Sequence, residues 1–404
     1  MPIKSTEILG RLKHGQETIP SRRILILATS YLPLIGGAEL AIKYLTDHLP
    51  EFSFDLITAR NTPDLARMEK IGNVSVFRTG DTLSVFNFIL PKNFLPLAIF
   101  FKAKKLLRQN NYDFVYVLQA SQAGGAGWLL KKLGYLKQPL VISFQEGKDL
   151  SRQPVLTRYF QKLIIGSADY LTVLSTYLKE FIISQGISEN RIFILPNGVN
   201  IPPAGPVNQA LKNSFGLGDE KVIITVSRLV EKNGLADLIK AMVFLKNNCS
   251  QPFKLLIVGD AEPHITLESG LKRLTQELGL SSDVIFTGAV KNEDVSHYLS
   301  LANVFVRPSL SEGLGISFLE AMSVGLPVIA TPVGGIPDFL EDGKTGLFCK
   351  VGDPEDIARK ILLIFNDNSL RQSIVVNAKR LIKERYTWEI VAQKFITTYD
   401  VIVK

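Results

Sequence analysis

The residues with the clearest chemical signal are two glutamates, Glu312 and Glu320, on either side of a glycine-containing turn. A short apolar run ends near Pro308, and a helix is predicted to begin about Gly315. Glycines let backbone N–H groups approach a ligand closely, and the unpaired amides at a helix start carry about half a positive charge. The sequence therefore predicts an anion-binding site at the start of this helix.

Both glutamates need hydrogen-bond donors. Glu320 falls in the second turn of the predicted helix, next to Phe318 and Leu319, so part of its side chain should be buried. Burying an unpaired carboxylate costs several kcal/mol. Ligand hydroxyls would supply the donors, and the alternative is that the two glutamates cap or salt-bridge the protein itself.

A cation is expected at the edge of a sheet near this site. Arg228 stands two residues after the apolar run 222–226, which places its guanidinium at the carboxyl edge of a predicted parallel sheet. Ligands of open α/β folds bind at that edge. A fixed cation there can stabilise negative charge as it develops on a phosphate.

The elements that must position these residues are read from short β-branched runs that alternate with helix-length segments. This alternation is typical of a parallel sheet with crossover helices. Strands are predicted at 24–28, 54–58, 74–77, 114–117, 140–143 and 170–174, and again at 222–226, 254–258, 284–287, 304–307, 327–331 and 346–349. Two sheets in succession, in a chain of 404 residues, predict an α/β protein of two domains.

The expected organisation follows from this pattern. Residues 1–21 form a polar tail, 22–200 the N-terminal domain and 201–387 the C-terminal domain, with the proline-rich segment 195–206 as the linker. The segment 388–404 has apolar residues at helical spacing, and we expect this helix to complete the N-terminal domain.

Composition narrows the chemistry. Two cysteines, Cys249 and Cys349, suit buried thiols in a reducing cytoplasm rather than a disulfide framework. The four histidines show no metal-ligand spacing, and no Asp-x-Asp motif occurs. The apolar stretch 94–101 is too short to span a bilayer. We expect a cytoplasmic protein without a bound metal or cofactor.

Charge is unevenly distributed, because residues 1–200 carry a net charge of +9 and the remainder −1. A basic surface suits an anionic substrate, nucleic acid or phospholipid headgroups, or it is simply solvated. In segment 86–108, aromatic and aliphatic residues adjoin Lys102, Lys104 and Lys105. This segment either rests on an anionic membrane, where it could receive a lipid-linked acceptor, or is a buried helix ending in exposed lysines.

The run from Glu312 to Glu320, with seven residues between the glutamates and Ala-Met after the second, resembles the signature of the family 4 retaining glycosyltransferases (glycosyl transferases group 1). Further similar elements occur in the family's order from about residue 22 to the C-terminus: Gly36-Gly37-Ala38-Glu39, Leu195-Pro196-Asn197-Gly198-Val199, Ser227-Arg228-Leu229-Val230, Ile257-Val258-Gly259-Asp260, Phe286-Thr287-Gly288-Ala289-Val290, Val333-Gly334-Gly335-Ile336-Pro337 and Asp342-Gly343-Lys344-Thr345-Gly346-Leu347. The resemblance implies the GT-B architecture, with two Rossmann-like domains facing each other across a deep cleft.

The resemblance also implies an activity and a donor site. The enzyme would move a sugar from a nucleotide-diphosphate sugar to an acceptor hydroxyl, with Glu320 on the ribose hydroxyls and Glu312 beside the transferred sugar. Val290 would line the pocket for the base. Backbone amides would make further donor contacts at Gly36, Gly37, Leu314, Gly315 and Ile316. We expect UDP-linked sugars before GDP-linked ones.

The chain departs from the family pattern in two places. The family's second cation usually stands five residues after the arginine, where this chain has Asn233. We assign Lys232 instead, so that Arg228, Lys232 and Glu312 form the catalytic set. A His-Gly-x-Asp element is also missing, and Glu146 and Asp149 are expected on the acceptor side unless they are solvated charges of a turn.

Other readings of the same fold stay open at this stage. A sugar-nucleotide epimerase or hydrolase would be expected to carry histidines in the cleft motifs, and a non-catalytic binder is suggested by Asn233 and the missing histidine. A dinucleotide enzyme is disfavoured because Gly125-Ala126-Gly127 lacks the third glycine. For the transferase we expect a glycan or lipid-linked acceptor in cell-surface polysaccharide, glycolipid or glycoconjugate synthesis. We also expect the basic domain to contact the inner face of the membrane, and we expect no nucleic-acid partner.

Overall fold

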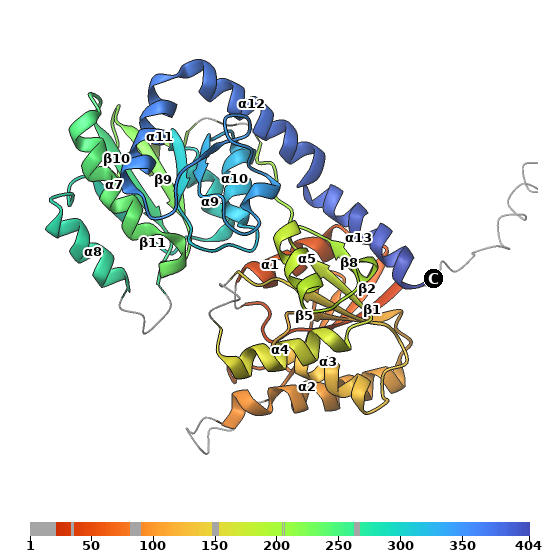
Figure 1. Ribbon diagram of the computed structural model, residues 1–404. Helices are drawn as coiled ribbons and strands as arrows, with labels where there is room; N and C mark the ends of the chain where they lie inside the picture. The colour runs from red at the N-terminus through yellow and green to blue at the C-terminus, as the bar shows by residue number, and fades with distance from the viewer. Residues whose placement is uncertain are drawn as a thin grey trace, which may run out of the picture.

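Two α/β units, each a parallel sheet with helices on both faces, make up the chain in this computed structural model (Figure 1). The structure describes residues 22–33, 36–80, 90–147, 153–203, 205, 207–261 and 267–404. The prediction of an α/β protein with two sheets is confirmed. The expected polar tail, residues 1–21, lies outside the described residues.

The first sheet contains eight strands within the described ranges, in the order β3-β4-β2-β1-β5-β6-β7-β8. The strands are Arg22–Leu27 (β1), Phe52–Ala59 (β2), Met68–Ile71 (β3), Val74–Thr79 (β4), Phe114–Leu118 (β5), Leu140–Phe144 (β6), Tyr170–Val173 (β7) and Ile192–Ile194 (β8). Neighbouring strands are parallel except for β3, which is antiparallel to β4. The strand order changes direction between β1 and β5, where a crevice opens in folds of this type.

The second sheet has six parallel strands among the residues described, in the order β11-β10-β9-β12-β13-β14. They are Lys221–Val226 (β9), Phe253–Val258 (β10), Val284–Gly288 (β11), Val304–Arg307 (β12), Val328–Ala330 (β13) and Leu347–Phe348 (β14). All strands predicted for the first sheet and all those predicted for the second are present. Two strands were not predicted: β3, an edge strand with no buried residue, and β8, which has three residues.

Helices cover both faces of each sheet. On the first sheet, Gly37–Asp47 (α1) and Trp388–Ile402 (α13) lie on one face, and Leu90–Gln109 (α2), Gln122–Lys132 (α3), Val155–Ser167 (α4) and Thr176–Ser184 (α5) lie on the other. On the second, Leu235–Asn248 (α7), Leu267–Glu277 (α8) and Pro354–Asn366 (α11) lie opposite Val295–Leu299 (α9), Ile316–Val324 (α10) and Asn368–Arg385 (α12), and Gln209–Ser214 (α6) precedes β9.

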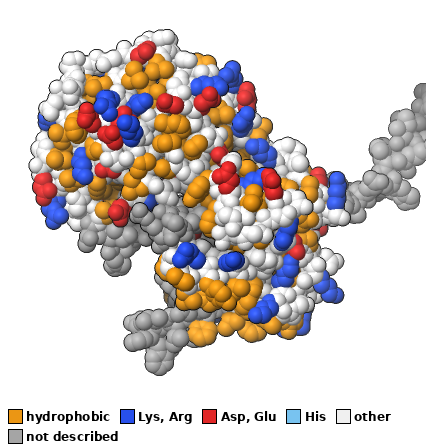
Figure 2. Space-filling model, in the orientation of Figure 1, with side chains coloured by type: hydrophobic (Ala, Val, Ile, Leu, Met, Phe, Trp, Pro, Cys, Tyr) orange, Lys and Arg blue, Asp and Glu red, His pale blue; other side chains and the backbone are white. Residues whose placement is uncertain are grey.

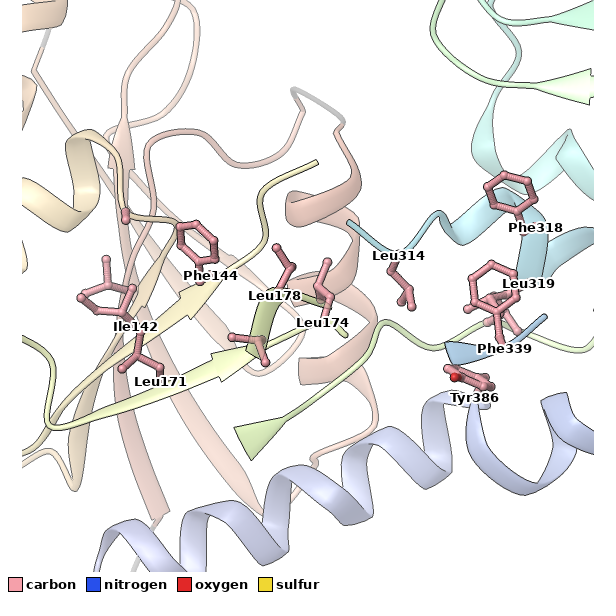
Figure 3. Packing of buried hydrophobic residues seen from close by; sticks show 14 of the residues in the cluster. Ile142, Phe144, Leu171, Leu174, Leu178, Leu314, Phe318, Leu319, Phe339 and Tyr386 are labelled. Atoms are coloured by element: carbon pink, nitrogen blue, oxygen red, sulfur yellow. The ribbon is translucent and has the colours of Figure 1, made fainter. Parts of the chain in front are cut away.

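The core follows the alternation of side chains along the strands. Ile24 and Ile26 of β1 belong to the apolar cluster under α1 and α13, while Leu25 and Leu27 belong to the cluster on the other face. That second cluster crosses between the domains, and Leu314 lies between side chains of the first domain and those of the second (Figure 3). Because the two units share this core, the expected boundary at residues 200 and 201 stays a prediction.

The last helix returns to the first domain. The ring of Phe395 on α13 lies 5.9 Å from that of Phe52 and 6.5 Å from that of Phe114, measured between centroids. The hydroxyl of Tyr399 donates to Asp113 at 2.9 Å. The C-terminal end of the chain thus packs on the N-terminal sheet, where it ties the two domains together (Figure 1).

This packing predicts the effect of removing one ring from α13. Phe395→Ala should lower the free energy of unfolding by about 3–5 kcal/mol, because it leaves a cavity between the helix and the sheet. Urea denaturation measures the loss. Val401→Ala, on the same helix but 45% exposed, should stay within about 0.5 kcal/mol of the unchanged protein. Equal, small effects at both positions would show that α13 is not firmly docked.

Candidate functional site

The predicted donor-side residues lie at the carboxyl ends of adjacent strands in the second sheet. Arg228 stands two residues after β9, and Glu312 lies in the loop after β12, the neighbour of β9. The strand order reverses at this point, which is where open α/β folds bind ligands. Val290 follows β11 at the same edge of the sheet and is half-buried.

The starts of two helices meet in the seam between the domains. The helix α10 begins at Ile316, and α1 begins at Gly37 in the other domain. A Cβ placed on Gly37 would lie 3.9 Å from Cδ1 of Ile316. Within the described part of the chain, no backbone carbonyl accepts a hydrogen bond from the amides of Leu314, Gly315 or Ile316. The open amides of α10, with the partial positive charge of a helix start, therefore lie close to the start of α1 in the other domain.

Gly315 is required by the turn that starts α10. Its φ is 90°, in the left-handed region that side chains disfavour. A Cβ at this position would also lie 2.5 Å from the ring of Phe318 and 2.8 Å from Nη2 of Arg307. Only glycine lets the chain turn this tightly against the buried arginine.

Arg307, at the end of β12, is a site residue to which the sequence analysis gave no role. Its side chain is 6% exposed, and its Nη2 donates to Oε2 of Glu312 at 2.8 Å. Its Nη1 donates to Oγ of Ser317 at 2.7 Å and to the carbonyl of Val226 at 3.2 Å, and its guanidinium lies 4.0 Å from the ring centroid of Phe318. The available signal was a charge that directly continues an apolar strand, because buried charges need partners.

Lys232 crosses the seam. Its Nζ donates to the carbonyl oxygen of Gly147 in the other domain at 2.9 Å and lies 3.7 Å from Oε1 of Glu312. Burial lowers the pKa of the ammonium, and the Glu312 carboxylate opposes this shift. Asn233 is buried, and its amide donates to the carbonyl of Arg228 at 2.7 Å, so it closes the turn instead of entering the seam. Lys232 is thus beside Glu312, and its chemical role stays a prediction.

The loops of the two domains touch at the same point. A Cβ on Gly313 would lie 2.6 Å from the carbonyl oxygen of Glu146. The Glu146 carboxylate accepts a hydrogen bond from the amide of Gly147 at 3.2 Å. The loop of the predicted acceptor-side glutamate therefore adjoins the donor-side loop, whereas Asp149 lies outside the described residues.

Glu320 lies in α10 with its side chain largely, but not fully, buried. Burial raises the pKa of its carboxyl group to about 7, and the nearby charge of Arg307 works against this rise. No residue in the described ranges donates a hydrogen bond to this carboxylate. The geometry leaves it in need of donors, while Glu312 obtains them from the protein.

A cavity of about 530 Å³ opens in the first domain where the strand order reverses between β1 and β5. Polar side chains line it, among them Thr29, Ser30, Glu39, Arg60, Asn61 and Gln119. Gln119 has a φ of 67°, a strained conformation of the kind that clusters at functional sites. The sequence analysis did not predict this cavity, since its wall is assembled from the ends of four strands and three helices.

Two further findings concern the described residues alone. Within those ranges, no group of three or more His, Cys, Asp or Glu side chains is placed to hold a metal ion. None of the helices formed by those residues has the length and apolar character needed to cross a bilayer.

The Arg307–Glu312 pair predicts a strong effect on stability. Arg307→Met should lower the free energy of unfolding by about 3–5 kcal/mol, because it leaves the Glu312 carboxylate without its main partner. Adding Glu312→Leu in the same chain should recover part of this loss, since two apolar side chains then replace the pair. Urea denaturation of the single and double variants gives the coupling. Additive losses would contradict the pairing.

The raised pKa of Glu320 predicts a pH dependence of the ligand-free protein. The folded state holds this proton more tightly than the unfolded chain, so stability is fully present at low pH. It is lost as pH rises from about 4.5 through 7. The loss should reach at most about 3 kcal/mol. Glu320→Gln should show a flatter profile in urea denaturation between these pH values, and parallel profiles would contradict the prediction.

Comparison with known proteins identifies the family to which this chain belongs. The family model for Glycosyltransferase Family 4 matches residues 35–201, and the model for Glycosyl transferases group 1 matches residues 207–381. A relative from Corynebacterium glutamicum, GDP-mannose-dependent monoacylated alpha-(1-6)-phosphatidylinositol monomannoside mannosyltransferase, is 28% identical over 93% of this chain and 97% of its own.

Solved structures share the fold. Sucrose-phosphate synthase from Thermosynechococcus elongatus matches with a TM-score of 0.80 at 22% identity, over 94% of this chain and 99% of its own. Anabaena HepE in complex with UDP and glucose matches with a TM-score of 0.78 at 20% identity, over 94% and 100%. The predicted family and the GT-B fold are confirmed, with both models in chain order. The chain is therefore a family 4 glycosyltransferase of the hexosyltransferase type, built on the GT-B fold.

Proposed function

We propose that this glycosyltransferase uses a nucleotide-diphosphate sugar and transfers the sugar to an acceptor hydroxyl with retention of anomeric configuration. The observation that carries the proposal is the meeting of two helix starts, at Gly37 of α1 and Ile316 of α10, in the seam between the domains. Open amides and partial positive charge favour a diphosphate at such a place. One domain alone supplies only half of this site.

Two cations would stabilise the leaving diphosphate. Arg228 is exposed at the carboxyl edge of the second sheet, and Lys232 reaches into the seam beside Glu312. Fixed positive charges lower the free energy of a transition state in which negative charge develops on the leaving group. We therefore propose a reaction without a bound metal or cofactor.

The two glutamates would have separate tasks. Glu320 lacks donors from the described residues, and ribose hydroxyls would supply them and favour the charged carboxylate. Glu312 is held by Arg307, so its carboxylate keeps one position beside the transferred sugar. In our proposal the acceptor attacks on the face that the diphosphate leaves, and the departing phosphate oxygen takes the proton. This path needs no enzymic nucleophile.

We propose a UDP-linked sugar as the donor, with the loop at Val290 lining the base pocket. The structural neighbour HepE holds UDP and glucose, which supports UDP, although the Corynebacterium glutamicum relative is named for GDP-mannose. The cavity in the first domain would receive a glycan or lipid-linked acceptor of cell-surface polysaccharide, glycolipid or glycoconjugate synthesis. The reaction would then take place on the cytoplasmic side of the membrane.

Donor binding is tested by thermal shift against a panel of UDP-linked and GDP-linked sugars. A ligand at a hundredfold its dissociation constant should stabilise the protein by about 2.7 kcal/mol. UDP-linked sugars should give the larger shift, and Glu320→Ala should reduce it. The absence of a shift with every nucleotide sugar, in protein that unfolds cooperatively, would overturn the donor proposal.

The role of the cations is tested by turnover. Arg228→Ala and Lys232→Ala should each lower the rate of transfer about 10²–10³-fold, because each removes charge stabilisation from the leaving group. Lys383→Ala, at an exposed position of α12, serves as the matched control. EDTA should leave the rate unchanged, and NMR of the product should show the anomeric configuration of the donor. Full activity in both site variants, loss with EDTA, or an inverted product would contradict the mechanism.

A further inference from the structure

Large hydrophobic side chains are exposed together on α2 and α4, on the outer side of the first domain. We call them the α2–α4 surface, and they are Phe94, Leu97 and Phe101 on α2 with Val155, Leu156, Tyr159 and Phe160 on α4. Figure 2 shows hydrophobic side chains gathered in this region, with Lys and Arg at their border. Exposed apolar patches of this kind mark interaction sites in soluble proteins.

The first two turns of α4 project from the domain. Every residue from 154 to 160 is exposed, and the helix is anchored by Ile164 and Ile165 near its other end. Val155 is 73% exposed and Leu156 is 67% exposed. Tyr159 and Phe160 follow each of these by four residues, so the four side chains form two adjacent rows along the helix.

The helix α2 also exposes large apolar side chains. Phe94, Leu97 and Phe101 stand three and four residues apart, so they share one side of the helix, and the same line continues to Lys105 and Arg108. The opposite side of α2 is buried in the core. The exposed stripe therefore changes from apolar to basic along its length.

Charge separates the two faces of this domain. The helices α2, α3 and α4 contain nine Lys and Arg and no Asp or Glu, and α5 on the same face adds Lys179 and Glu180. On the other face, α1 and α13 contain two Lys and four Asp and Glu. Lys102 and Lys104 lie 4.6 Å and 3.9 Å from the ring centroids of Phe77 and Tyr135. The cations of α4 are Arg158 and Lys162, four residues apart and both exposed.

The same helix α2 also borders the cavity of the first domain. The buried Leu95 lines that cavity, and its neighbour Phe94 belongs to the exposed side of α2. A Cβ on Gly80, another lining residue, would lie 3.3 Å from Cδ1 of Leu95. An acceptor headgroup in the cavity is therefore one helix away from the α2–α4 surface.

We propose that the α2–α4 surface docks on an anionic phospholipid bilayer. The side chains of α4 enter the headgroup region, and the surrounding cations bind the phosphates, as amphipathic basic surfaces do. The helices α2, α3 and α4, with nine cations and no carboxylate, complement such a membrane and repel other basic partners. The docking itself does not depend on the proposed function. Only the idea that docking brings a lipid-borne acceptor to the cavity rests on that function.

The docking is tested by flotation of the full chain with two kinds of vesicle. Vesicles of phosphatidylcholine with phosphatidylglycerol should carry the protein upward, those of phosphatidylcholine alone should not, and added salt should release it. Leu156→Ser with Phe160→Ser, and separately Arg158→Glu with Lys162→Glu, should each lower the vesicle-bound to free ratio by about tenfold. Failure of the unchanged protein to float, or flotation of both double variants to the same extent as the unchanged protein, would overturn the proposal.

Matched controls come from the second domain. Val376→Ser replaces a hydrophobic residue of α12 that is 65% exposed, and Lys383→Glu reverses an exposed cation of the same helix. Both should float like the unchanged protein. Size-exclusion chromatography tests whether a second copy of the chain, instead of a membrane, binds the α2–α4 surface. A dimer that the α4 variants dissociate, without vesicle binding, would assign the surface to self-association and overturn the proposal.

Donor binding separates this proposal from the proposed function. Every α4 variant should keep the thermal shift given by the nucleotide sugar, because α4 contributes no residue to the donor site. An α4 variant that no longer floats but keeps its thermal shift has lost membrane docking and kept the donor site. Flotation without any thermal shift would overturn the donor site and leave the membrane surface standing.

Discussion

The buried guanidinium of Arg307 constrains the loop on which the candidate site is built. It lies at the end of β12, where water cannot solvate it, and the Glu312 carboxylate and the Ser317 hydroxyl supply its partners. To bring both partners to one side chain, the loop must turn tightly at Gly315. The helix α10 then begins with its amides open to the seam. Because the buried charge of Arg307 needs both partners close by, it fixes the direction in which α10 starts.

The seam between the domains holds together through contacts that both sides supply. Lys232 donates to the carbonyl of Gly147, and the amide of Thr176 donates to Asp338 at 2.7 Å. The apolar cluster around Leu314 continues across the same boundary (Figure 3). Because the last helix packs on the first sheet, the chain crosses between the domains twice. The two helix starts that face the seam are therefore held in register by the whole architecture, and neither loop alone positions them.

The two domains divide the chemistry by their electrostatics. The second provides the loop with Glu312 and the strand-end cation Arg228, which suit a donor that carries its own negative charge. The first provides a cavity lined by polar and apolar side chains, and the helices α2, α3 and α4, which carry cations and no carboxylates. Of segment 86–108, the structure describes residues 90–108, where α2 buries one side in the core and exposes Phe94, Leu97 and Phe101 on the other. Contact of this segment with a membrane stays a prediction.

The sequence by itself determined the features that depend on near neighbours along the chain. Alternation of residue types located the strands, Gly315 marked the start of a helix, and the spacing of Glu312 and Glu320 indicated the family. Only the tertiary structure decided which distant groups meet. The partner of Arg307, the carbonyl that receives Lys232, the cavity wall and the exposure of α4 all depend on contacts between distant segments. Val155 and Phe160 are apolar yet exposed, because burial depends on what packs against a side chain, which no local pattern contains.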